Sequence, residues 1–273
     1  MQNVVRRGWF VVLLCAIGTP ATSQSPQVPA KNPSATTQSA GAQVERKRLL
    51  AEDVFKNVAI FKGKDAARLI PAMDALRGLL GVDCTHCHTQ FDWANESKPT
   101  KQKARQHFKL IEMVNREYFG GGNAASCWTC HRGQAVPMKY QRDEDAVAHA
   151  TVAIQIPAAS AELPAERVFK NIQRLKGVSA GRLPLVMAMF TKSLGVGCEH
   201  CHVEGMWELD DKPEKTKARG MLSMVGAING QFYGGNGPVH CVNCHQGNVK
   251  PELVSGTPSE GVFSPAAATA QPK

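Results

Sequence analysis

The stretch Cys84-Thr85-His86-Cys87-His88 is the first of four copies of a C-x-x-C-H pattern around which the chain is organised. Each copy places two thiols three residues apart and a histidine directly after the second thiol. The other copies begin at Cys127, Cys198 and Cys241. Together the four copies use every cysteine of the sequence except Cys15, which lies near the N-terminus.

A constant offset of 114 residues relates two halves of the chain, without a gap from residue 54 to residue 137. Val54-Phe55-Lys56-Asn57 recurs as Val168-Phe169-Lys170-Asn171, and Lys98-Pro99 recurs as Lys212-Pro213. Such self-similarity indicates a duplicated structural unit. We expect one repeat over residues 46–137, a linker over residues 138–163 that mixes charge with Ala, Pro and Ser, and a second repeat over residues 164–254.

The C-x-x-C-H pattern is the attachment site of c-type haem. Two thiols at this spacing reach the two vinyl groups on one porphyrin edge, and the histidine becomes the fifth iron ligand. Disulfide bonds would not explain the histidines, and an exported setting disfavours thiolate zinc sites. The sequence therefore predicts four covalent haems, with thioether bonds to Cys84, Cys87, Cys127, Cys130, Cys198, Cys201, Cys241 and Cys244 and proximal ligands His88, His131, His202 and His245.

Both ends of the chain differ in composition from the repeats. Residues 1–23 read as a signal peptide, with Arg6 and Arg7 before a short apolar run. Lipidation of Cys15 stays open, since Leu14 precedes it where a lipoprotein signal has a small residue. Residues 24–45 and 255–273 are rich in Ser, Pro, Ala, Gln and Thr and are predicted to be disordered tails.

The sixth position of each iron decides what such a protein can do, because a thioether or imidazole there makes an electron carrier. Leu69, Met73 and Leu80 share a helical spacing that ends before Gly81. Met73 lies 11 residues before Cys84, and Met187 lies 11 residues before Cys198. We expect both to be distal ligands, although methionine is more often a core residue.

A second helical stretch precedes the second motif of each half, over residues 103–115 and 217–229. At the repeat offset, only the pair His107 and Met221 offers an iron ligand in both halves. We assign these two as the remaining distal ligands, in the simplest case for the haems of His131 and His245. Met224 and Met113 are the alternatives.

With these residues, the chain resembles the tetrahaem cytochrome c subunit of photosynthetic reaction centres over residues 54–137 and 168–251. The resemblance implies a mainly α multihaem cytochrome with two pseudo-symmetric dihaem halves, much irregular loop and little or no β-structure. It also implies haems in a roughly linear chain, three with His/Met ligands and one with two histidines, which suits Met73, Met187, Met221 and His107. The bis-histidine partner can come from outside its own haem's segment.

The expected function is electron transfer and not catalysis. The resemblance implies that the protein takes electrons from a soluble periplasmic carrier and re-reduces the photo-oxidised primary donor of a reaction-centre core. The alternatives are a periplasmic or extracellular respiratory carrier, including one that forms filaments, or a multihaem reductase with one open iron position. We expect an exported, periplasmic protein that contacts a membrane only through a partner or an N-terminal anchor.

The formal charge of +9 and the aromatic content of 6% fit the same prediction. A basic chain commonly binds an acidic partner such as nucleic acid. Here two propionates on each of four haems nearly cancel the positive charge, so no nucleic-acid partner is expected. Four porphyrin rings would also supply the aromatic core that the side chains lack.

Overall fold

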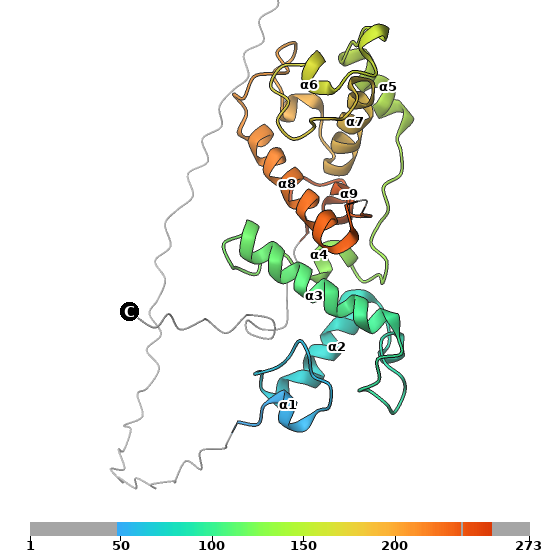
Figure 1. Ribbon diagram of the computed structural model, residues 1–273, viewed down its shortest axis with the longest axis vertical. Helices are drawn as coiled ribbons and strands as arrows, with labels where there is room; N and C mark the ends of the chain where they lie inside the picture. The colour runs from blue at the N-terminus through green and yellow to red at the C-terminus, as the bar shows by residue number, and fades with distance from the viewer. Residues whose placement is uncertain (1–47, 236, 253–273) are drawn as a thin grey trace, which may run out of the picture. The chain divides into compact units, whose positions relative to one another are not determined.

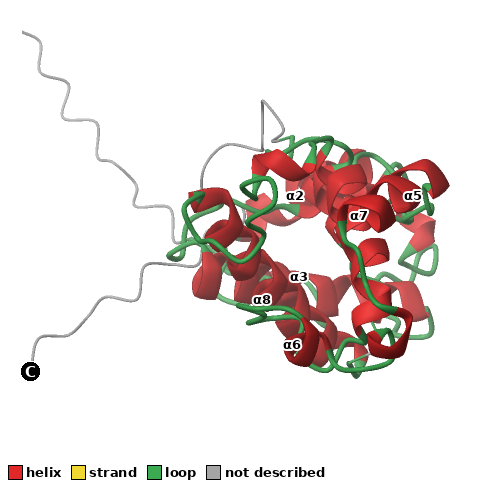
Figure 2. Ribbon diagram, turned by 90° about the horizontal axis from the view of Figure 1, so that it is seen from above, coloured by secondary structure: helices red, strands yellow, loops and turns green. Residues whose placement is uncertain are grey.

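The computed structural model describes residues 48–235 and 237–252. Within these residues the chain is mainly helical, and only isolated β-bridges occur in place of strands (Figure 2). The predicted fold class is thus confirmed. The predicted signal peptide with Cys15 and the two predicted tails, residues 24–45 and 255–273, lie outside the described residues.

The secondary structure repeats at the same offset as the sequence (Figure 1). The first half contains α1 (Ala51–Val54), η1 (Ala66–Arg68), α2 (Leu69–Leu80), η2 (Cys84–His86), α3 (Pro99–Tyr118) and α4 (Cys127–His131). The second half contains α6 (Ala165–Val168), η4 (Ala180–Arg182), α7 (Leu183–Leu194), η5 (Cys198–His200), α8 (Pro213–Tyr233) and α9 (Cys241–His245). The assignment of these halves as dihaem units stays a prediction.

A helix interrupts the segment that was predicted to be a linker. α5 (Glu144–Ala153) is followed by the short turn η3 (Ala158–Ser160). The carboxylate of Asp143 caps α5 by accepting from the amide of Ala146 at 3.0 Å, and its other oxygen pairs with Lys192 of α7 at 3.0 Å. α5 packs extensively on α7. The alanine-rich sequence of this segment is therefore part of the folded unit.

Glycines set where the methionine-bearing helices α2 and α7 end. Gly81 and Gly195 adopt left-handed conformations, with φ of 62° and 65°. A side chain at either position would clash with the carbonyl group of Gly133 or Gly247. The amide of Gly133 donates to the carbonyl oxygen of Leu79 at 3.1 Å, and the amide of Gly247 donates to that of Ser193 at 2.8 Å. Each half thus ties the end of its first long helix to the segment that follows its second motif.

The apolar core is built largely from small side chains. Among the described residues, about half of the buried apolar side chains are alanines, and the largest side chain that is completely buried is that of Ser193. One cluster contains Phe61 with Ala51 and Ala72. The other joins α3 to α8 through Met113, Val114 and Ile228 and so connects the two halves.

Candidate haem-binding site

Each C-x-x-C-H motif forms a short helical turn, as 3-10 turns η2 and η5 or as short helices α4 and α9. Local side chains shape these turns. Asp83 accepts a hydrogen bond from the amide of His86 at 3.1 Å at the start of η2. The hydroxyl group of Thr129 accepts from the amide of Ser126 at 2.9 Å at the start of α4. Residues three positions apart lie on one side of such a turn, so the two thiols of a motif face the same way.

The eight motif cysteines are free thiols in the structure. Burial raises the pKa of the Cys127 thiol to about 11 and also raises the pKa of Cys87, Cys201 and Cys241. These thiols are neutral at neutral pH. Their environment therefore suits an apolar group such as a porphyrin edge.

The proximal histidines share one arrangement. The Nδ1 of His88 donates to the carbonyl oxygen of Trp93 at 2.9 Å, and His202 repeats this contact with Trp207 at 3.0 Å. In the second motifs, the acceptors are the carbonyl groups three residues further along, with His131–Gln134 at 2.9 Å and His245–Asn248 at 3.0 Å. A histidine whose Nδ1 is held this way presents Nε2 as the metal ligand.

The surroundings of two of these rings, those of His131 and His202, favour the uncharged form. Burial lowers the pKa of His131 and of His202, although the bonds from Nδ1 to backbone carbonyl groups oppose the shift. Lys215, Arg219 and Lys212 lower the pKa of His202 further. The neutral imidazole, which is the form that binds metals, is therefore favoured.

The two second motifs lie against each other, because α4 packs on α9. The Sγ atoms of Cys130 and Cys244, which are equivalent in the repeat, are 2.9 Å apart. Burial and the hydrogen bond with Cys244 raise the pKa of the Cys130 thiol, the hydrogen bond more strongly. The repeat predicts that these cysteines are equivalent, but it carries no signal that they meet, since such a contact depends on how the halves pack.

The predicted distal methionines of the first helices occupy equivalent positions. Met73 on α2 is half-buried and packs against the cluster of Ala51, Phe61 and Ala72. Met187 on α7 is half-buried as well. Their ligand role stays a prediction.

His107 lies beside His131, the proximal histidine with which the simplest assignment pairs it. The two ring centroids are 5.7 Å apart with an interplanar angle of 41°. The Nε2 of His107 is 3.0 Å from the hydroxyl group of Tyr233, a residue of the other half. Burial lowers the pKa of His107, and so do the nearby charges of His131 and Lys103.

The other predicted ligands on α3 and α8 differ in burial. Met113 is only 4% exposed and belongs to the apolar cluster between the two helices, where the half-buried Met224 also packs. Met221 is half-buried outside this cluster. The packing of Met113 and Met224 accounts for them as core residues, and the choice among the three stays a prediction.

Buried donors without partners test whether the site fits haem. The Nε1 of Trp128, the Nε of Arg132 and the hydroxyl group of Tyr140 are buried and have no hydrogen-bond partner in the structure. Trp128 lies within the second motif and Arg132 follows it directly. Such groups are costly when unpaired, and propionate carboxylates are acceptors of the kind they lack. The donor set of thiols, neutral imidazoles and unpaired donors thus fits haem.

No helix among residues 48–235 and 237–252 combines the length and the apolar character that a membrane span requires. In the same part of the chain, no three His, Cys, Asp or Glu side chains converge on a common metal position.

The fold is mainly helical, and each C-x-x-C-H turn ends in a histidine whose Nε2 is left for a metal. These features define the class of c-type cytochromes. Within that class, the sequence model of the photosynthetic reaction centre cytochrome c subunit matches residues 15–156 and 138–272. The chain belongs to this family, whose members are haem electron carriers, and the predicted family is confirmed.

Individual relatives agree with the family. The photosynthetic reaction center cytochrome c subunit of Thermochromatium tepidum is 36% identical over 36% of this chain and 25% of its own length. The subunit of Rubrivivax gelatinosus is 23% identical over 74% of this chain and 68% of its length. Cytochrome c-554 of Chloroflexus aurantiacus is 34% identical over 32% of this chain. The chain thus spans from a quarter to about two thirds of the length of these reaction-centre subunits.

Proposed function

We propose that the chain is an exported tetrahaem cytochrome that passes single electrons along four haems to a membrane-bound photosynthetic reaction centre. When bound, haem iron supplies a one-electron couple. Each pair of motif cysteines would hold one haem, and His88, His131, His202 and His245 would ligate the irons through Nε2. The repeated bond from Nδ1 to a backbone carbonyl group is the single observation that carries this proposal.

Distal ligands would close the irons and so favour electron transfer over substrate chemistry. Met73, Met187, Met221 and His107 are the proposed ligands. The ring of His107 lies beside that of His131, with centroids 5.7 Å apart, so this imidazole would be near enough to serve as the second histidine of a bis-histidine haem. This contact supports a bis-histidine site formed by these two residues.

The contact between the second motifs supports an order for the haem chain. Because Cys130 and Cys244 are 2.9 Å apart, the haems of the second motifs would be neighbours in the middle of the chain. The haems of Cys84 and Cys198 would then lie toward its two ends. The contact between Cys130 and Cys244 would thus bring one haem-binding turn of each half together.

The partners follow from the family. An electron would come from a soluble reduced redox protein and would go to the photo-oxidised primary donor of a reaction-centre core, one electron in each step. Two of the relatives that cover about three quarters of this chain are named as subunits of that assembly. The positive charge of the chain would largely balance the haem propionates, which leaves no need for a nucleic-acid partner.

Flash photolysis tests the proposal. The haem-loaded protein would be added to reaction-centre membranes that lack their own cytochrome subunit, and re-reduction of the primary donor would be followed after a flash. We expect fast re-reduction with simultaneous oxidation of haem in the added protein. A protein that carries four reducible haems but leaves the re-reduction rate unchanged would contradict the photosynthetic role and favour respiratory or extracellular electron transfer.

A further inference from the structure

Each half contains a buried lysine that the proposed haem ligation leaves without a role. Lys101 on α3 is 7% exposed, and Lys215 on α8 is 9% exposed. Lysine is almost never this buried unless its charge is paired. The contacts of the two ammonium groups therefore indicate what the burial achieves.

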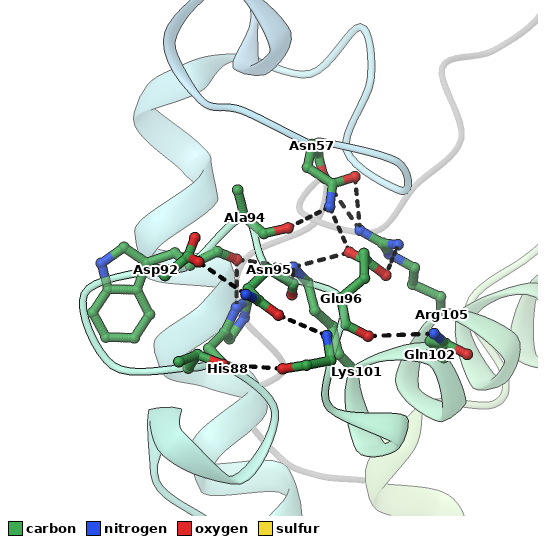
Figure 3. A network of polar contacts seen from close by, with 12 residues as sticks. Asn57, His88, Asp92, Ala94, Asn95, Glu96, Lys101, Gln102 and Arg105 are labelled. Carbon is green, nitrogen blue, oxygen red and sulfur yellow. Dashed lines mark hydrogen bonds and ion pairs between the residues drawn. The ribbon is translucent and has the colours of Figure 1, made fainter.

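Both ammonium groups bind the loop that follows the first motif of their half. The Nζ of Lys101 donates to the carbonyl groups of Trp93 and Asn95, at 2.8 Å each, and pairs with Glu96 at 3.1 Å (Figure 3). The second half repeats the arrangement. There the Nζ of Lys215 donates to Trp207 at 2.8 Å and to Leu209 at 2.7 Å, and pairs with Asp210 at 3.1 Å.

The carbonyl group of Trp93 links Lys101 to a proximal histidine, because it also accepts from the Nδ1 of His88 at 2.9 Å. An acceptor on Nδ1 increases the electron density that imidazole gives to a metal. A cation on the same oxygen weakens this acceptor. The cation is also linked to the His88 ring through this shared oxygen, and a positive charge there would disfavour the more positive, oxidised state of an iron that His88 ligates. Both effects favour the reduced state.

The carboxylate that pairs with each lysine also pairs with an arginine. Glu96 also pairs with Arg105 at 2.6 Å, so one carboxylate faces two cations. In the second half, Asp210 pairs with Arg219 at 2.9 Å as well as with Lys215. Each carboxylate is thus shared between two cations, and the positive charge that contacts the shared carbonyl oxygen directly is that of the lysine.

We propose that Lys101 and Lys215 are positioning residues that raise the reduction potentials of the haems ligated by His88 and His202. They do so by fixing and polarising the carbonyl groups of Trp93 and Trp207. The proposal rests on the proposed haem sites but does not depend on which distal ligand serves which iron. The haems of His131 and His245 serve as internal references, because their histidines donate to other carbonyl groups.

Redox titration of the haem-loaded protein, followed by optical spectroscopy, tests this inference with paired substitutions. Lys101→Met should lower one of the four reduction potentials by ~59 mV. For a one-electron couple, this shift is about a tenfold change in the ratio of oxidised to reduced haem. Lys101→Arg should restore most of the potential. Glu96→Gln should move the same potential upward, because it removes the opposing charge. Lys215→Met should act on a different haem.

Matched controls separate this local effect from a general loss of charge or fold. Lys109→Met and Lys217→Met remove the same charge from exposed positions on α3 and α8, and we expect little change. Damage to the fold would not give shifts of opposite sign for Lys101→Met and Glu96→Gln. A loaded protein whose potentials stay unchanged, or shift alike in the variants and controls, would contradict this inference alone. A purified chain without haem would contradict the proposed function as well.

Discussion

At the scale of single residues, the predicted proximal histidines share one feature, a hydrogen bond that their Nδ1 donates. The bond that it donates to a backbone carbonyl group fixes the tautomer and leaves Nε2 available for the proposed ligation of iron. The C-x-x-C-H pattern predicted these four histidines, because the spacing of the motif carries the chemistry. The pattern does not predict the acceptors, since the loop that supplies a carbonyl group takes its path from contacts such as that of Lys101.

The proposed role of Met73 as a distal ligand is tested by Met73→His. Imidazole stabilises oxidised iron relative to a thioether, so one potential should fall by a fraction of the roughly 0.8 V that axial ligands span. The other three should remain almost unchanged in a redox titration of the loaded protein. Met138→Leu, at an exposed methionine that is not among the candidate ligands, is the control and should shift none. If no potential falls in Met73→His, Met73 is not a ligand.

The stability of the protein in acid tests the ion pairs that Asp210, in the loop before α8, makes with Arg219 and Lys215 of that helix. The Arg219 guanidinium, followed by the amide of Asn171, holds the pKa of Asp210 well below its usual value. The unfolded carboxylate takes up a proton near about pH 4, whereas the folded one does so only at lower pH. The stabilisation is therefore complete above about pH 4 and is lost as the pH falls.

Thermal unfolding of the loaded protein between pH 7 and acid measures this contribution. Asp210→Asn should unfold at a lower temperature at neutral pH and should show a flatter decline in acid. Asp211→Asn removes the same charge from an exposed neighbour and should follow the unmodified protein. Equal curves for the two variants would show that the pairing of Asp210 with Arg219 does not stabilise the fold.

At the scale of elements, α2 was predicted well and α5 was missed. The helical spacing of Leu69 to Leu80 and the stop at Gly81 are both confirmed, because apolar periodicity and a left-handed glycine are local signals. α5 lies in a segment of Ala, Pro, Ser and charge that resembled a linker. Its weak amphipathic pattern gains stability from packing on α7, and such a tertiary contact is not visible in a local pattern.

Gly195 at the end of α7 gives the clearest stability test at this scale. Gly195→Ala should destabilise the loaded protein by about 1–2 kcal/mol for the left-handed conformation, plus ~1–3 kcal/mol for crowding the carbonyl group of Gly247. Gly205→Ala is the matched control, since Gly205 has φ of 72° and open space around it. Its first-half equivalent, Phe91, already adopts φ of 63°. Equal losses in denaturant titrations would show that the close approach is unimportant.

At the scale of the whole molecule, the described residues bury few large side chains. Alanines make up about half of the buried apolar set, and the thin aromatic composition predicted a core that is completed by cofactors. The sequence also predicted the two equivalent halves, because duplication is directly visible at a fixed offset. The repeat does not specify which surfaces of its two copies face each other. The contacts of Cys130 with Cys244 and of His107 with Tyr233 could therefore not be predicted.

The chain without haem should therefore fold poorly. Production in a cellular compartment that lacks haem attachment should give a protein with some helix but no cooperative thermal transition, because the side chains alone bury too little apolar area. Circular dichroism during heating, compared with the haem-loaded protein, measures this. A compact haem-free chain that unfolds in one sharp transition would contradict the cofactor-filled core.

The intact mass of the mature protein, isolated from a host that attaches c-type haem during export, tests the central claim most directly. The account predicts a mass that exceeds the polypeptide by four haems. It further predicts that replacing both cysteines of a single motif by alanine removes one haem and leaves the other three. A native protein that carries fewer than four covalent haems, or none, would contradict the claim that every C-x-x-C-H turn is a haem site.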